Sequence, residues 1–219
     1  MAQIEFRDRR DAGRVLANAL AAWRGQPEVV VLALPRGGVP VAWEVARALQ
    51  VPLDVLVVRK LGFPGQEELA MGAIGPGGVR VMSDIPRMWP VSDAEVEKVI
   101  EREQAELARR ERLYRGERAP LALAGHVAIL VDDGLATGAS MHAAALTVRA
   151  MQPRCIVVAV PVGSREAVQL LHTVADEVVC IHVPEPFRAV GLWYEDFGQT
   201  SDEEVRELLQ GAGWRADRG

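Results

Sequence analysis

Two neighbouring carboxylates close an apolar run in the second half of the chain. Asp132 and Asp133 directly follow residues 127–131, and at the end of a strand both side chains can reach the same opening. Adjacent carboxylates repel one another, so hydroxyl donors or a cation between them stabilise the pair. A ribose offers two vicinal hydroxyls, and Mg²⁺ accepts carboxylate oxygens directly or through its bound waters. The pair therefore predicts a site for a sugar diol, for Mg²⁺, or for both.

Small residues continue the chain beyond the two acids. Glycines let backbone N–H groups curl into a concave cup, and a helix that begins near Gly138 directs its positive end at the same point. The acids and the cup together fit the two ends of a ribose 5-phosphate, although each piece alone also fits a plain turn or a helix start. The residues assigned to the phosphate are Gly134, Leu135, Ala136, Thr137, Gly138, Ala139 and Ser140.

The ten residues 131–140 resemble the signature of the type I phosphoribosyltransferases. That signature is an apolar strand, two acids, a few small or apolar residues, then Thr-Gly and a small or hydroxyl residue. The resemblance implies that the chain binds 5-phosphoribosyl 1-pyrophosphate and transfers its ribose 5-phosphate to a nitrogenous acceptor, of the nucleobase kind, with release of pyrophosphate. It also implies Mg²⁺ as cofactor, catalytic and metal-binding roles for Asp132 and Asp133 (directly or through water), a homodimer, and a place in nucleotide salvage.

A second loop is assigned to the pyrophosphate. In the family, the loop after an early strand binds this group, and Pro35-Arg36-Gly37-Gly38 matches it. Arg36 can form a bidentate contact with a diphosphate, and Gly37 and Gly38 let the backbone approach closely. The alternative is a plain tight turn before a helix.

A basic pair and a glycine-rich segment follow the next predicted strand. Arg59 and Lys60 are expected to end that strand and to contact the same phosphates, with Lys60 also taking part in catalysis; otherwise they are cations that extend into solvent. Residues 61–90 are rich in glycine and proline and are predicted to form the flexible flap of the family, with a hairpin around 70–74 and 79–82. The alternatives for this segment are a subunit contact or a simple excursion.

Residues 184–199 are the candidate for the hood that covers the acceptor base in the family. They hold four of the eleven aromatic residues of the chain, and stacking on a planar base suits such side chains. Phe187, Trp193 and Tyr194 are assigned to the acceptor base, and Phe197 is expected to pack internally. Aromatic residues also commonly belong to the core.

One position departs from part of the family. In the members that act on 6-oxopurines an aspartate assists at the base, and Ala136 stands at the matching place. This argues against a hypoxanthine or guanine enzyme of the usual design and leaves the acceptor open. A second interpretation is a non-catalytic regulatory protein that binds 5-phosphoribosyl 1-pyrophosphate or a nucleotide. A nucleotide-binding oxidoreductase ranks last, because the first strand is not followed by Gly-x-Gly-x-x-Gly.

The elements that must position these residues alternate regularly. Short apolar runs with β-branched centres predict buried strands at 28–34, 51–58, 127–131, 155–160 and 178–183. Apolar residues at helical spacing predict helices at 8–23, 39–49, 92–115, 139–151, 164–173 and 201–209. This order predicts an α/β fold, with a mostly parallel twisted sheet and helices on both faces. Ligands of such sheets bind beyond the carboxyl ends of the strands.

Bulk properties narrow the class of protein. The chain has 219 residues, which suits a single domain over 1–219. A net charge of −5 argues against a nucleic-acid partner. No apolar run reaches membrane-spanning length and the N-terminus lacks the pattern of a signal peptide. The two cysteines, Cys155 and Cys180, are predicted as buried free thiols in strands, so we expect a cytoplasmic protein.

Overall fold

The computed structural model describes residues 5–83 and 91–211. Its centre is a five-stranded sheet in which all neighbouring strands run parallel. In spatial order the strands are β2 (Leu53–Val55), β1 (Val29–Ala33), β6 (Val127–Val131), β7 (Cys155–Val162) and β8 (Glu177–His182). The predicted α/β fold with a mostly parallel sheet is confirmed.

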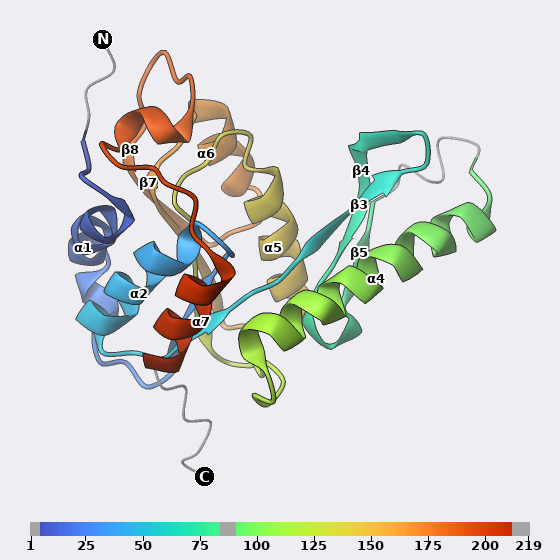
Figure 1. Ribbon diagram of the computed structural model, residues 1–219, viewed down its shortest axis with the longest axis horizontal. Helices are drawn as coiled ribbons and strands as arrows, with labels where there is room; N and C mark the ends of the chain where they lie inside the picture. The colour runs from blue at the N-terminus through green and yellow to red at the C-terminus, as the bar shows by residue number, and fades with distance from the viewer. Residues whose placement is uncertain (1–4, 84–90, 212–219) are drawn as a thin grey trace.

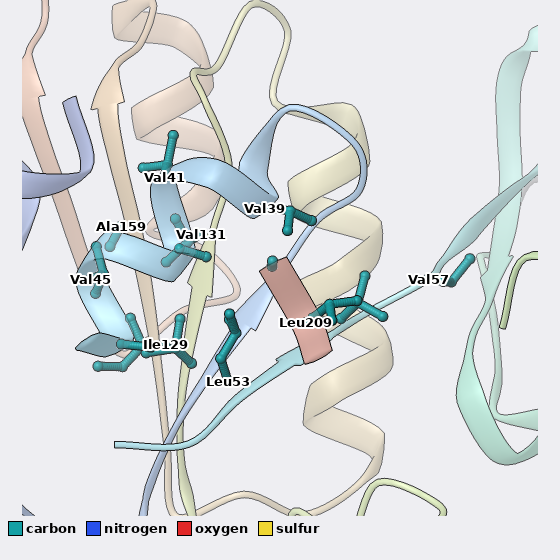
Figure 2. Close-up of a cluster of buried hydrophobic side chains, with 14 of the residues drawn as sticks. Val39, Val41, Val45, Leu53, Val57, Ile129, Val131, Ala159 and Leu209 are labelled. Carbon is teal, nitrogen blue, oxygen red and sulfur yellow. The ribbon is translucent and has the colours of Figure 1, made fainter. Parts of the chain in front are cut away.

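Helices cover both faces of this sheet, because its strands are apolar throughout. Every residue of β1 and β6 is buried, and alternate side chains enter separate clusters on the two faces. One cluster includes α1 (Arg9–Ala19), α2 (Gly38–Leu49) and α7 (Asp202–Gly211), and the other includes α5 (Ala139–Ala150) and α6 (Arg165–Leu171). Figure 2 shows part of the first cluster, in which Ile129 and Val131 of β6 lie with Val41 and Val45 of α2.

A second sheet and a long helix form an arm that extends away from the central sheet (Figure 1). This sheet is antiparallel and consists of β3 (Arg59–Phe63), β4 (Gln66–Ile74) and β5 (Arg80–Met82). The 3-10 helix η2 (Pro76–Gly78) joins β4 to β5, so the predicted hairpin is confirmed. Helix α4 (Asp93–Arg115) packs along the sheet. Part of the predicted flap, residues 84–90, lies outside the described residues.

The prediction was wrong about the end of the second strand. β2 has three residues, and Arg59 and Lys60 begin β3 of the arm instead of ending a strand of the central sheet. Leu56 and Val57 between them are buried although they belong to neither strand. The apolar run in the sequence continues through this segment, so hydrophobicity alone does not mark where the chain passes from the central sheet to the arm.

Buried polar contacts fasten the root of the arm. Asp54 of β2 is fully buried, and its carboxylate accepts hydrogen bonds from Arg115 at 3.0 Å and from Arg118 at 3.5 Å. Tyr114, near the end of α4, donates its hydroxyl to Asp202 Oδ1 at the start of α7, at 2.6 Å. The base of the arm is thus joined to both β2 and α7.

The start of the described chain packs beside β8 and the segment that follows it. Phe6 forms a parallel bridge with Tyr194, directly after the 3-10 helix η3 (Val190–Trp193). A further 3-10 helix, η1 (Ala21–Trp23), follows α1. The thiols of Cys155 and Cys180 are free and half-buried. Within the described ranges, no helix is long and apolar enough to cross a membrane.

Candidate functional site

The two candidate loops meet at the carboxyl ends of neighbouring strands. β1 and β6 pair in register, with Ala33 opposite Val131, so the loop after each strand leaves the sheet at the same edge. The amide of Leu34 continues the pairing with a hydrogen bond to the Val131 carbonyl at 2.9 Å. The sequence places the acids and the Arg-Gly-Gly loop about a hundred residues apart, and the sheet brings them into contact.

Both glycines of the first loop lie directly against the two acids. A Cβ added to Gly37 would stand 2.0 Å from Asp133 Oδ2, and one added to Gly38 would stand 3.1 Å from Asp132 Oδ1. These glycines were predicted to admit the pyrophosphate; in the structure they make room for the carboxylates. The Gly38 amide donates to the Leu34 carbonyl at 3.1 Å and is therefore already engaged.

The electrostatics of the acids fit a cation or hydroxyl donors. Burial, and then repulsion by Asp133, raise the pKa of Asp132 well above its ordinary value. Burial also raises the pKa of Asp133, and the nearby Arg9 guanidinium limits that rise. The Asp133 amide donates to Asp132 Oδ1 at 2.9 Å. Two half-buried carboxyls that resist ionisation together gain the most from positive charge supplied by a ligand.

An arginine from the first helix, which the sequence analysis missed, engages one of the acids. Arg9 Nε donates to Asp133 Oδ2 at 2.8 Å, and Arg9 Nη1 donates to the Gly198 carbonyl at 2.6 Å. The guanidinium also lies 4.0 Å from the centre of the Phe197 ring. Local spacing gave no signal for this contact, because 124 residues separate Arg9 from Asp133.

The phosphate cup forms at the start of α5. Gly138 has φ +75°, a conformation that favours glycine, and α5 begins at the next residue. Within the described ranges, the amides of Ala136, Thr137, Gly138 and Ser140 donate no hydrogen bond. Free amides at a helix N-terminus are a ready anion site, so this segment can hold a phosphate.

The structure corrects the prediction for Leu135. Its amide donates to the Val162 carbonyl at 2.9 Å, and its side chain is buried. Ser164, at the start of α6, holds the other side of this loop because its hydroxyl donates to the Ala136 carbonyl at 2.7 Å. Leu135 thus anchors the cup and does not line it, and Ser164 is a supporting residue that sequence reasoning missed.

The basic residues separate into different surroundings. Arg36 follows a cis peptide bond, and its Nη1 lies 3.7 Å from Asp202 Oδ1, the oxygen that also accepts the Tyr114 hydroxyl. Arg59 pairs with Glu103 of α4 at 2.6 Å, so its predicted pyrophosphate role is corrected. Lys60 has the opposite orientation, because successive side chains of a strand alternate between faces.

The register of the arm gives the direction of Lys60. Lys60 pairs with Ala73, so the two share the face of the sheet that Arg59 and α4 do not occupy. Gly75, two residues after Ala73, packs against Thr147 of α5. Lys60 therefore lies on the sheet face toward α5, the helix whose first turn forms the phosphate cup.

The hood prediction needs one correction. Tyr194 is 4% exposed, packs with Phe6, and donates its hydroxyl to the Asp133 carbonyl at 2.6 Å, so it cannot stack on a base. Phe187 and Trp193 are half-buried beside this cluster. Phe197, expected to be internal, is 37% exposed, with one face against the Arg9 guanidinium.

The donor set fits a cation that is shared with a substrate. In the parts of the chain that the structure describes, no group of three His, Cys, Asp or Glu side chains could hold a metal ion alone. Mg²⁺ commonly binds through one or two carboxylates together with substrate phosphates and water. Asp132 and Asp133 provide such carboxylates, so their arrangement is compatible with Mg²⁺.

Known proteins resemble this chain over most of its length. The family described as Phosphoribosyl transferase domain matches residues 9–192. Two Mycobacterium tuberculosis proteins, named "Putative phosphoribosyl transferase MT0597" (strain CDC 1551 / Oshkosh) and "Putative phosphoribosyl transferase Rv0571c" (strain ATCC 25618 / H37Rv), are each 52% identical over 208 residues. These matches cover 94% of this chain and 47% of each relative, so the chain spans about half the length of the curated relatives it matches.

A solved structure is similar over nearly the whole of this chain. The crystal structure of TT1426 from Thermus thermophilus has 47% sequence identity and a TM-score of 0.85, and the match covers 96% of this chain and 100% of that one. Together with the family match over residues 9–192, these findings show that the chain belongs to the phosphoribosyl transferase domain family.

Proposed function

We propose that the chain binds 5-phosphoribosyl 1-pyrophosphate with Mg²⁺ and transfers its ribose 5-phosphate to a nitrogenous acceptor, of the nucleobase kind, with release of pyrophosphate. The observation that carries this proposal is that three features lie at the carboxyl edge of one sheet. These are the acids Asp132 and Asp133, the free amides at the start of α5, and the loop 35–38 packed against the acids. A ribose 5-phosphate needs acceptors for its hydroxyl groups and an anion site for its phosphate.

Each part of the substrate has its own partners in this proposal. The amides of Ala136, Thr137, Gly138 and Ser140 bind the 5-phosphate, supported by the positive end of α5. Asp132 and Asp133 accept hydrogen bonds from the ribose hydroxyls. Arg36, the Gly37 backbone and Lys60 bind the pyrophosphate, and Arg36 exchanges its long contact with Asp202 for this group.

The chemistry follows from the charges of these groups. The bond between C1 of the ribose and the pyrophosphate oxygen breaks, which leaves positive charge on the sugar, and the fixed carboxylates stabilise that charge. When bound, Mg²⁺ supplies positive charge that stabilises the departing pyrophosphate, and Asp132 and Asp133 would hold it directly or through water. The acceptor nitrogen then forms its bond to C1 and loses its proton. Ala136 offers no carboxylate to assist at the base.

Titration calorimetry with 5-phosphoribosyl 1-pyrophosphate and Mg²⁺ tests the binding step. We expect saturable binding that Asp132→Asn and Asp133→Asn weaken about tenfold or more, because each removes a charged acceptor. Asp176→Asn is the matched control, because Asp176 is half exposed and pairs with Arg149. Asp176 lies just before β8, at the amino ends of the strands, whereas the proposed site lies at their carboxyl ends. Equal affinities in all four proteins would contradict the proposed site.

Pyrophosphate release with a panel of purine, pyrimidine and other nitrogen acceptors tests the transfer step. Release that depends on one acceptor identifies both the activity and the acceptor. Binding without release for every acceptor would instead support the regulatory alternative, in which the chain senses 5-phosphoribosyl 1-pyrophosphate or a nucleotide. A protein that binds neither would refute both.

A further inference from the structure

Arg9 is unusually enclosed for an arginine. Its side chain is 12% exposed, and an arginine is rarely buried without partners. The guanidinium is held on two edges by Asp133 Oδ2 and the Gly198 carbonyl, and on one face by the Phe197 ring. Three contacts, one from Asp133 and two from the adjacent residues Phe197 and Gly198, therefore fix the position of its positive charge.

The surroundings of Asp133 leave Arg9 as its counter-ion. The neighbouring Asp132 carboxylate repels it, the α2 side presents the backbone of Gly37, and the Tyr194 hydroxyl binds its carbonyl oxygen and not its carboxylate. Within residues 5–83 and 91–211, Arg9 is the only cation that contacts this carboxylate. The ion pair uses Oδ2, so Oδ1 remains for another donor.

We propose that Arg9 is a positioning residue that fixes the orientation of the Asp133 carboxylate through Oδ2, with Oδ1 presented to a ribose hydroxyl. This inference rests on the proposed function, because it assigns the free oxygen to the sugar. It extends the site to the first residue of α1 and to the segment around Phe197, neither of which belongs to the strand-end loops. Arg9 itself contacts protein groups only and is not assigned to substrate.

Rescue by a conservative variant separates this role from a general structural one. In Arg9→Met the Asp133 carboxylate loses the donor that orients it, so affinity for 5-phosphoribosyl 1-pyrophosphate, measured by calorimetry, falls about tenfold. Arg9→Lys retains a cationic donor but not the planar fork, so it restores part of the affinity, which stays below that of the wild type. Arg10→Met is the control, because Arg10 stacks on Trp43 instead.

Crystal structures of the ligand-free wild type, Arg9→Met, Arg9→Lys and Arg10→Met test the inference without substrate. A rotated Asp133 carboxylate in Arg9→Met, with the wild-type orientation kept in Arg10→Met, would support the positioning role. A wild-type orientation of Asp133 in Arg9→Met would overturn it; if Arg9→Met does not fold, the comparison of Arg9→Lys with Arg10→Met decides in the same way. Failure of the wild type to bind 5-phosphoribosyl 1-pyrophosphate would refute the proposed function and leave this comparison of orientations interpretable.

Discussion

The substitution Gly37→Ala tests the contact between the two loops with one added methyl group. Gly37 has φ −59° and ψ −31°, so alanine fits the backbone without strain. The new Cβ would lie 2.0 Å from Asp133 Oδ2 and 2.7 Å from Asp133 Cγ, whereas ordinary contact begins at 3.4 Å. The carboxylate oxygen must therefore retreat by about 1.4 Å, the difference between these two distances.

A displacement of that size is incompatible with the 2.8 Å hydrogen bond from Arg9 to Asp133. Losing a hydrogen bond to a charged group costs about 1.5–3 kcal/mol, and replacing glycine by alanine at a compatible position returns about 0.4–1 kcal/mol. We expect a net loss of about 1–2 kcal/mol in the free energy of unfolding, measured by urea denaturation. Affinity for 5-phosphoribosyl 1-pyrophosphate should fall about 10- to 100-fold in calorimetry.

Gly25→Ala is the matched control for this experiment. Gly25 has φ +68° and no neighbouring atom within 4 Å of an added Cβ. Alanine there costs about 1–2 kcal/mol in backbone strain but leaves the site unchanged, so stability should fall while affinity does not. A folded Gly37→Ala protein with wild-type affinity would refute the assignment of Asp133 to the ligand.

Three further substitutions give distinct outcomes. The raised pKa of Asp132 means that the folded protein holds a proton that the unfolded chain releases, so the free energy of unfolding falls as pH rises through the raised pKa. Asp132→Asn should flatten this pH dependence and raise Tm at pH 8. An unchanged slope of Tm against pH in scanning fluorimetry would contradict this prediction. Tyr194→Phe removes the 2.6 Å hydrogen bond to the Asp133 carbonyl and should cost about 1–2 kcal/mol in urea denaturation. Asp54→Asn leaves Arg115 buried without its counter-ion and should cost about 3–5 kcal/mol, whereas a small loss would mean that the pair contributes little.

The local sequence pattern was sufficient to predict the site where the functional residues directly follow a buried strand. The acids Asp132 and Asp133 come directly after a strand that is buried on both faces, and the loop with Arg36 follows another such strand. Because parallel neighbours release their loops at one edge, the contact between these segments could be predicted. The parallel sheet followed from the same continuous β-branched runs.

Contacts that do not follow from the order of the strands could not be predicted from the sequence. Nothing near Arg9 indicates a partner 124 residues away. Tyr194 and Phe197 are three residues apart and chemically similar, yet the first is buried and the second is exposed. Which of them lies inside depends on the packing of Phe6 against this segment. Similarly, the partner of Arg59 depended on a strand boundary that an unbroken apolar run concealed.

One oxygen atom at the root of the arm contacts both Arg36 and the long helix α4. Asp202 Oδ1 is the nearest anion to Arg36 and also the acceptor of the Tyr114 hydroxyl. Tyr114 lies near the end of a 23-residue helix, a lever about 35 Å long. Under the proposed function, a diphosphate that binds Arg36 would take it away from Asp202 and leave the Tyr114 hydroxyl as the remaining partner of this oxygen. The proposed contact with the leaving group and the anchor of the long helix would therefore share one carboxylate.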